Sequence, residues 1–247
     1  MKCKRFQKTF APALVLALAV GTAIFFFRPP AVDCAFSPSR FAGEIVVIDA
    51  GHGGEDGGAV SLSGVAESQI NLAIALRLDQ VLGLYGVNTV MLRDSDISLH
   101  DADARTLREK KVSDLHNRVN TIESLENPVV ISIHQNTFQS GKYHGAQVFY
   151  ANGDLSLPLA QITQSMLRQA LDPDNDRKPT AAPESVYLMN HISCRAILVE
   201  CGFLSNARED ALLQSSSYQI KLAAALAGAY LSYQETTQEG ETLTNAT

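Results

Sequence analysis

Four side chains in this sequence are of a type that can bind a metal ion or move a proton, and each lies at a boundary of a predicted strand or helix. His52, His134 and Glu200 each lie at or just beyond the end of a short apolar run, and Glu67 opens a helical pattern. In open α/β sheets, functional sites form outside the carboxyl ends of the strands. We therefore expect these four side chains to converge at one edge of a sheet.

The residue types define the chemistry expected at that edge. Two neutral imidazoles and one carboxylate are the donor set of a catalytic zinc site with an open fourth position, and the best division assigns His52, Glu67 and His134 as ligands. Zinc would lower the pKa of a water to about 7, and the remaining carboxylate, Glu200, would take its proton and pass it to a leaving amine. This predicts an amide hydrolase. The ligands are scattered along the chain, so a structural role for the strand-end histidines is the alternative.

The loop around His52 holds five glycines between Gly51 and Gly58. A dinucleotide-binding loop is one interpretation, but the next helix starts only at about Glu67, too late to place a phosphate on its N-terminus. The favoured interpretation is that the glycines allow positive φ angles and keep the rim of a metal site open. Asp49, just before the loop, is either a hydrogen-bond acceptor that orients His52 or a structural residue at the strand end.

Periodic patterns indicate strands that alternate with helices, which predicts an α/β domain with a largely parallel sheet. The predicted strands are 45–48, 87–92, 128–133, 145–150 and 195–199, and the predicted helices are 67–85, 114–125, 155–171, 207–213 and 218–233. We expect the charged segment 94–113 to be a solvated loop or a short exposed helix, with a flap that contacts substrate as the alternative.

The N-terminal segment, residues 1–28, has a basic flank followed by the uncharged run Ala11–Phe27. Seventeen helical residues span about 25 Å, slightly short of a hydrocarbon core. An uncleaved membrane anchor is preferred over a cleaved signal, and either one predicts an exported domain. We expect a linker at 29–43, a catalytic domain at 44–235 and a polar, frayed tail at 236–247.

Beyond residue 28 the chain carries 15 basic and 26 acidic residues, a formal charge of −11. Nucleic-acid binding depends on neutralising phosphates, so this acidic balance argues against a nucleic-acid partner. Cys194 and Cys201 lie on one predicted strand, where seven extended steps cover about 23 Å. A disulfide between them is excluded on that spacing.

Several motifs follow one another along the chain: IDAGHGGEDGGAV, the glutamate before QINLAIALRL, MLRDSD, DLHNRVN, ISIHQNTF, GAQVFY and LVECGFLSN. In this order they resemble the zinc-dependent N-acetylmuramoyl-L-alanine amidases of the Amidase_3 type, over about residues 44–233. Within that family the chain is most similar to the sporulation (CwlD-type) amidases, in its N-terminal apolar segment and in the stretches GKYHGAQVFY and ESVYLMN.

The resemblance implies zinc ligands at His52, Glu67 and His134 and a catalytic glutamate at Glu200. It also implies a single three-layer, zinc exopeptidase-like α/β domain with a mixed, largely parallel sheet of about six strands. The implied reaction is cleavage of the amide between N-acetylmuramic acid and L-alanine of the peptidoglycan stem peptide. Sporulation members prepare spore-cortex peptidoglycan for muramic δ-lactam formation, and some need a lipoprotein partner.

Other positions leave alternatives open. Arg93 and Arg118 match family arginines, and we expect structural salt bridges for both, with substrate contact as the alternative. Asn136 either donates a hydrogen bond at the pocket rim or caps a loop. The competing functions are a zinc carboxypeptidase or other peptidase on a related fold, which would need an arginine clamp for a terminal carboxylate, and a non-catalytic wall-binding protein.

Overall fold

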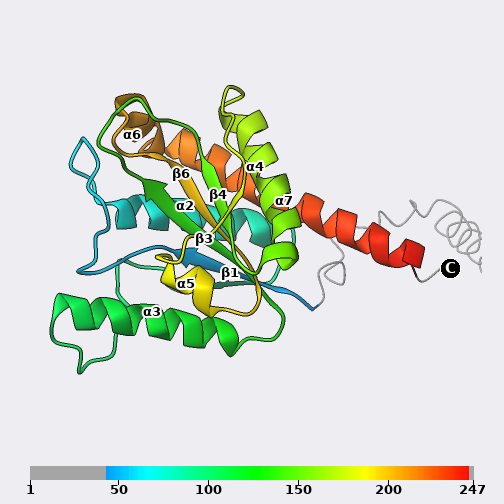
Figure 1. Ribbon diagram of the computed structural model, residues 1–247, viewed down its shortest axis with the longest axis horizontal. Helices are drawn as coiled ribbons and strands as arrows, with labels where there is room; N and C mark the ends of the chain where they lie inside the picture. Colours follow the sequence, from blue (N-terminus) through cyan, green and yellow to red (C-terminus); the bar gives the residue numbers. More distant parts are fainter. Residues whose placement is uncertain (1–42, 245–247) are drawn as a thin grey trace, which may run out of the picture. The chain divides into compact units, whose positions relative to one another are not determined.

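The apolar runs of the chain pair into one six-stranded sheet in the order β2-β1-β3-β6-β4-β5 (Figure 1). The computed structural model describes residues 43–244. The strands are β1 Ile45–Ala50, β2 Thr89–Met91, β3 Pro128–Asn136, β4 Gln147–Tyr150, β5 Thr180–Ala181 and β6 Arg195–Phe203. Strands β2, β1, β3 and β6 are parallel, whereas β4 pairs antiparallel with β6 and parallel with β5. The expected mixed, largely parallel sheet is therefore confirmed.

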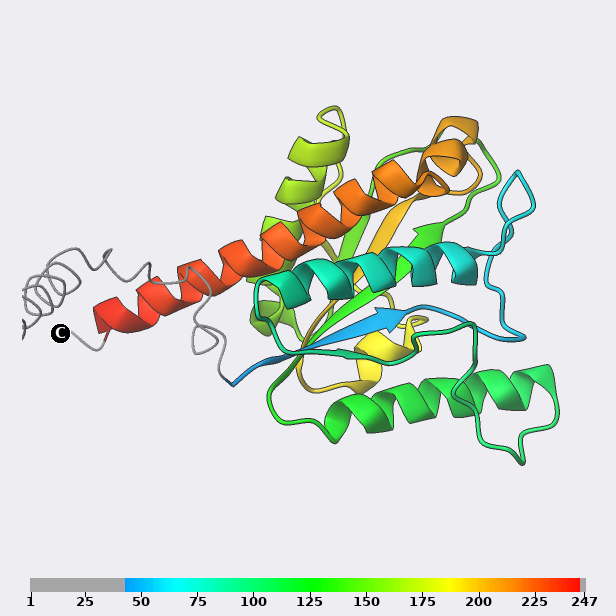
Figure 2. The ribbon, with the colours of Figure 1, turned by 180° about the vertical axis from the view of Figure 1, so that it is seen from behind.

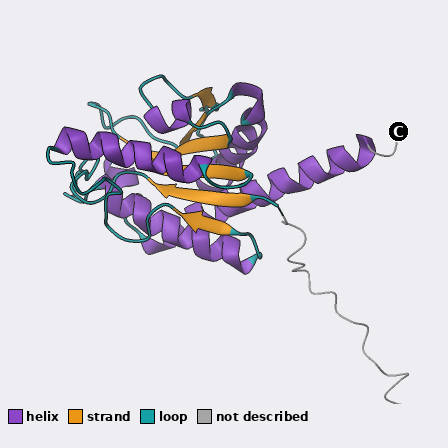
Figure 3. Cartoon of the chain, turned by 90° about the horizontal axis from the view of Figure 1, so that it is seen from below, coloured by secondary structure: helices purple, strands orange, loops and turns teal. Residues whose placement is uncertain are grey.

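Helices cover both faces of this sheet, which gives three layers (Figures 2 and 3). The helices are α2 Glu67–Leu84, α3 Leu107–Glu123, α4 Leu157–Leu171, α5 Tyr187–His191, α6 Ala207–Leu213 and α7 Ser216–Thr244, with a 3-10 turn at Gly153–Leu155. One face is covered by α2, α4 and α7, and the other by α3 and α5. The single α/β domain expected from the alternation of elements is confirmed.

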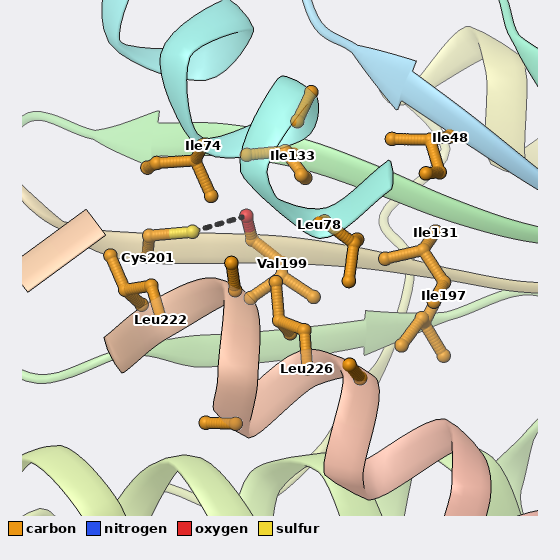
Figure 4. Close-up of a cluster of buried hydrophobic side chains, with 14 of the residues drawn as sticks. Ile48, Ile74, Leu78, Ile131, Ile133, Ile197, Val199, Cys201, Leu222 and Leu226 are labelled. Atoms are coloured by element: carbon orange, nitrogen blue, oxygen red, sulfur yellow. Dashed lines mark hydrogen bonds between the residues drawn. The ribbon is translucent and has the colours of Figure 1, made fainter. Parts of the chain in front are cut away.

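Alternate strand residues supply the two cores, because successive side chains of a strand point to opposite faces. Ile48 packs in the larger core against α2 and α7, where Leu78 and Leu226 meet the strand side chains (Figure 4). Val47 packs in the smaller core under α3 and α5. By the same alternation Asp49, two residues after Val47, lies on the α3 and α5 face.

The two strands that carry His134 and Glu200 continue beyond these residues. Strand β3 runs to Asn136 and β6 to Phe203, whereas the apolar runs predicted ends at Ile133 and Val199. The pairing persists because the ladder shifts register between His134 and Asn136 instead of ending there. A bulge of this kind re-aims side chains near a site.

Helix α3 begins at Leu107, so the last seven positions of segment 94–113 form the exposed helix that was one of its expected states, and the helix predicted from residue 114 begins seven residues earlier. The start is set by a capping box: the Thr106 side chain accepts from the Glu109 N–H, and the Glu109 carboxylate accepts from the Thr106 N–H. This pairing satisfies two otherwise free donors at the helix end. The many charged residues of this segment predicted solvent exposure and did not indicate where the helix begins.

Helix α7 also runs further than predicted, to Thr244 instead of Tyr233. Gln234 is buried, and its amide donates to the Glu44 carboxylate and to the Tyr230 hydroxyl. These bonds stabilise α7 just before residues 236–247, which were expected to fray because they are polar.

The prediction of an N-terminal membrane segment is not tested by the described residues, whereas the prediction of unpaired cysteines is confirmed. The N-terminal segment at 1–28 lies outside the described residues, and within 43–244 no helix is both long and apolar enough to cross a membrane. Cys194 and Cys201 are both free thiols, as the strand spacing predicted, and Cys201 is buried.

Candidate metal centre

Glu67, the first residue of α2, places a buried carboxylate between the two predicted histidine ligands. Its Oε2 lies 3.4 Å from Nε2 of His52, and its Oε1 lies 3.1 Å from Nδ1 of His134. One ligand atom from each of the three residues lies within 4.8 Å of the other two. The structure therefore brings together the three side chains that the sequence singled out as metal ligands.

The surrounding backbone fixes the Glu67 carboxylate in its ionised form. The Ala59 N–H donates to Oε2 at 2.9 Å, and the Gln135 N–H donates to Oε1 at 3.1 Å. Burial raises the pKa of Glu67, but hydrogen bonds and charge from His134 and His52 outweigh it and hold the pKa far below its ordinary value. An ionised carboxylate is the form that coordinates a metal ion.

His52 has an unusual backbone, with a φ of 62° in the left-handed region. Its Nδ1 lies 3.0 Å from Oδ2 of Asp56, which leaves Nε2 directed at Glu67. Burial lowers the pKa of His52, but hydrogen bonds to Asp56 and Glu67 raise it to about 9. Of the two roles left open for Asp49, the orientation of His52 falls instead to Asp56, four residues after His52 in the same loop.

Asp49 belongs instead to a buried ion pair on the α3 face. Its carboxylate accepts from the Arg118 guanidinium and, at 2.6 Å, from the Ser132 hydroxyl. Arg118 also donates to Asp114 at 2.7 Å, one helical turn earlier on α3. Arg118 thus forms the salt bridges expected of it, and Asp49 has the structural role at the strand end.

Two arginines hold the backbone that carries His52. Arg93 donates to the carbonyls of Ala50 at 2.8 Å and Gly51 at 3.0 Å, and Arg118 donates to the carbonyl of His52 at 2.8 Å. The expected salt bridge of Arg93 is corrected, because these bonds go to carbonyl oxygens. Three consecutive carbonyls are therefore fixed by buried guanidinium groups, which offsets the cost of the left-handed conformation at His52.

Two glycines of the loop leave room for the ligand side chains. A Cβ at Gly51 would overlap the imidazole of His134. A Cβ at Gly58 would lie 2.6 Å from Oε2 of Glu67 and 2.7 Å from Cδ2 of His52, and Gly58 also has a φ of +69°. The loop is glycine-rich at these positions because the donors occupy the space that a side chain would fill.

Glu200 lies directly beside this cluster but does not belong to it. It is the register neighbour of His134 on the adjacent parallel strand, and its Oε2 is buried with no hydrogen-bond partner among the described residues. Burial raises the pKa of Glu200 to about 7, with a further contribution from the charge of Glu67. A carboxylate that titrates near neutrality can both accept and return a proton.

A cleft of about 230 Å³ opens over His52, His134 and Glu200. Helix α3 and residues 185–188 form its walls, so the cleft lies on the α3 and α5 side of the sheet. Its lining includes none of residues 94–106, so that part of the predicted flap does not cover this cleft. Asn136 is not a lining residue either; its backbone carbonyl accepts from the Leu204 N–H at 2.8 Å.

The donor chemistry fits a zinc ion. Two imidazoles and one carboxylate within reach of one another match the ligand set of catalytic zinc sites, and Asp56 supplies the second hydrogen bond that such histidines usually make. Glu200 remains free beside them with an unpartnered oxygen. A three-layer α/β fold that gathers three possible metal ligands and a free carboxylate at one edge of its sheet is typical of hydrolases.

Comparison with known proteins gives the family. Residues 46–231 match the Amidase_3 model, described as N-acetylmuramoyl-L-alanine amidase. The chain belongs to this family, as its motifs indicated, and it is an N-acetylmuramoyl-L-alanine amidase that acts on peptidoglycan.

Individual relatives agree with the family model. The chain is 35% identical to the germination-specific N-acetylmuramoyl-L-alanine amidase of Bacillus subtilis, over 78% of this chain and 80% of that one. It is 30% identical to the amidase LytC of the same organism, covering 77% of this chain but 36% of LytC. The CwlD amidase from Clostridioides difficile, solved in complex with the GerS lipoprotein, superimposes with a TM-score of 0.75 at 34% identity, covering 78% of this chain and 98% of that chain. The expected similarity to CwlD-type amidases is confirmed.

Proposed function

We propose that this enzyme hydrolyses the amide between the lactyl group of N-acetylmuramic acid and L-alanine of the stem peptide, with one zinc ion held by His52, Glu67 and His134. The observation that carries the proposal is the convergence of these three donors within 4.8 Å beside the unpartnered carboxylate of Glu200. When bound, zinc supplies a lowered pKa for a coordinated water and polarises the scissile carbonyl.

The protein side chains have distinct roles in this reaction. Glu200 takes the proton of the attacking water and delivers it to the leaving nitrogen of L-alanine, for which its pKa of about 7 is suited. Asp56 fixes the orientation of the His52 ring through Nδ1. Arg93 and Arg118 hold the backbone under that ring.

Product analysis tests this function directly. The purified protein, loaded with zinc, is incubated with peptidoglycan fragments that carry intact stem peptides, beside a Glu200→Ala control. Mass spectrometry should find free stems that begin at L-alanine and glycans with bare lactyl groups in the wild type alone. Shortened stems that remain joined to muramic acid would instead identify a carboxypeptidase and contradict the proposal.

We further propose that the physiological substrate is spore-cortex peptidoglycan, where removal of stem peptides precedes muramic δ-lactam formation. The similarity to the germination-specific amidase supports this assignment. Deletion of the gene in a spore-forming host should abolish muramic δ-lactam in the muropeptide profile of the cortex. A normal δ-lactam content in the deletion strain would contradict it.

The same proposal includes location and partner. An exported enzyme, retained at the outer face of the membrane by residues 1–28, agrees with a peptidoglycan substrate. A lipoprotein partner is supported by the CwlD neighbour, which was solved with the GerS lipoprotein. If the zinc-loaded enzyme is inactive alone, a spore-envelope extract should restore cleavage, and an extract stripped of lipoproteins should not.

A further inference from the structure

Two side chains with a permanent positive charge line the cleft: Arg118 and Lys111, both on α3. Arg118 is committed to the protein, because its side chain is 2% exposed and its guanidinium donates to Asp49, Asp114 and the His52 carbonyl. Lys111 differs in this respect, with a side chain that is 54% exposed. Among the described cleft residues, Lys111 is therefore the cation that can reach a bound molecule.

Within the described cleft, Lys111 forms an ion pair with Asp56, and a bound anion could replace Asp56 in it. Its Nζ lies 3.2 Å from Oδ2 of Asp56, and the Asp56 side chain is itself 34% exposed. Exposed pairs of this kind contribute little to stability. Asp56 keeps its bond to His52 Nδ1 when Lys111 moves away, so the ammonium group can turn toward a ligand without releasing the histidine.

Most other charged side chains of the cleft are already paired within the protein, Asp49 and Asp114 with Arg118 and Asp56 with His52. Asp49, Asp56, Asp114 and Glu200 all line it, and the chain beyond residue 28 carries an excess of acidic residues. An anionic group on the substrate needs a specific cation to bind here, because an unpaired charge in a partly dry cleft is costly.

The proposed substrate has such a group close to the scissile bond. The second stem residue is a glutamate joined through its side-chain carboxyl, which leaves its α-carboxylate free in unmodified stems. Successive Cα atoms are about 3.8 Å apart, so this carboxylate lies one residue step beyond the cleaved amide. Lys111 lines the same cleft as His52, and its Nζ contacts the Asp56 oxygen that also bonds Nδ1 of His52.

We infer that Lys111 binds the free α-carboxylate of the second stem-peptide residue and makes the enzyme prefer stems in which this carboxylate is not amidated. The inference rests on the proposed amidase function and adds a specificity-determining residue to it. Lys111 acts on binding of the substrate, and Glu200 acts on the chemistry.

The test compares two synthetic muramoyl peptides that differ only in that group, a carboxylate in one and a primary amide in the other. The zinc-loaded full-length enzyme should cleave the carboxylate form with a kcat/KM about tenfold higher, the effect of one hydrogen bond to a charged group. Lys111→Gln should raise KM for the carboxylate form about tenfold, leave kcat within about twofold and abolish the preference. Lys111→Glu should invert the preference, because it places a carboxylate against a carboxylate.

The adjacent residue Lys110 provides a matched control. Its Nζ pairs with Glu55 at 2.6 Å, and it does not line the cleft, so Lys110→Gln should keep the wild-type preference. A Lys111→Gln enzyme that still prefers the carboxylate form would overturn the inference and leave the amidase function standing. Loss of zinc, or an equal fall in kcat on both substrates, would show that Lys111 acts through Asp56 and would also overturn it. A wild-type enzyme that cleaves neither peptide, even with the spore-envelope extract added, would refute the proposed function and this inference together.

Discussion

Glu200 and His134 occupy the same register position on two adjacent parallel strands, β6 and β3. Their side chains leave the sheet on the same face. Two residues earlier on β3, Ser132 occupies the same register position as Asp49 of β1, on the other side of β3, and donates a hydrogen bond to it. The carboxylate that we propose transfers the proton and one candidate metal ligand thus lie on the central strands. Sites built on such rigid elements hold their geometry better than sites on loops.

The first prediction concerns this pair. Glu200→Gln should lower kcat by a factor of about 10² to 10⁴, the usual contribution of a general acid–base group. Zinc content should be unchanged, because Glu200 is not one of the three converging donors. Steady-state kinetics and metal analysis of the same preparation check both parts, and loss of zinc in the variant would show that the division between ligands and base is wrong.

The second prediction concerns the space around the donors. Gly58→Ala should weaken zinc binding at least tenfold, because the new Cβ would meet the Glu67 carboxylate and the His52 ring. Gly64→Ala is the matched control: its φ of +87° imposes a similar backbone cost, but no atom lies within 4 Å of the added Cβ. Competition with a chromophoric chelator measures zinc affinity in both variants. Equal losses would assign the effect to backbone strain alone.

The four principal residues could be predicted from the sequence because strong local signals mark them. His134 and Glu200 come directly after the apolar runs of β3 and β6, and parallel strands bring their carboxyl ends to the same edge of the sheet. Glu67 sits at the start of a clear helical period. The α/β class followed from the alternation of predicted strands and helices. The fold class and the convergence of the three possible metal ligands could therefore both be predicted from the sequence.

The supporting residues could not be assigned in the same way, because their partners are set by tertiary packing. Arg93 donates to Gly51 from 42 positions away, and no local pattern separates that bond from a salt bridge. Asp56 was missed as the partner of His52, although its spacing of four in the same loop offered a signal. The capping box of Thr106 and Glu109 was also readable, and it would have placed the start of α3 correctly.

The third prediction concerns competition between zinc and protons. In the metal-free protein the pKa of His52 is raised to about 9 by Asp56 and Glu67, so His52 carries a proton at pH 7. Zinc needs the neutral imidazole, so its apparent affinity should rise about tenfold per pH unit up to about pH 9 and level off above it. Asp56→Asn weakens the hydrogen bond that raises the pKa of His52, and should move the pH at which the zinc affinity levels off to a lower value.

Calorimetry checks this competition independently of catalysis. Zinc titrations at pH 7 in two buffers of different ionisation enthalpy should show release of at least one proton per ion bound. Release of no proton would mean that His52 is already neutral in the metal-free protein and would contradict the prediction.

The last prediction concerns the buried ion pair between Asp49 and Arg118. Burial raises the pKa of Asp49, but the charge of Arg118 and the bond from Ser132 outweigh it and lower the pKa below 3.8. A carboxyl whose pKa is lower in the folded state stabilises the fold fully well above its ordinary pKa, and this contribution declines as the pH falls through 3.8 toward the folded-state value. Asp49→Asn should therefore cost about 3–5 kcal/mol at pH 7, where it leaves Arg118 partly unpaired, and measurably less at pH 3. Urea unfolding at both pH values measures the difference, and Glu55→Gln, which removes an exposed partner of Lys110, should change the stability little at pH 7 because exposed ion pairs are weak. A cost for Asp49→Asn that stays constant between pH 7 and pH 3 would show that the stabilisation does not come from the ionised carboxylate.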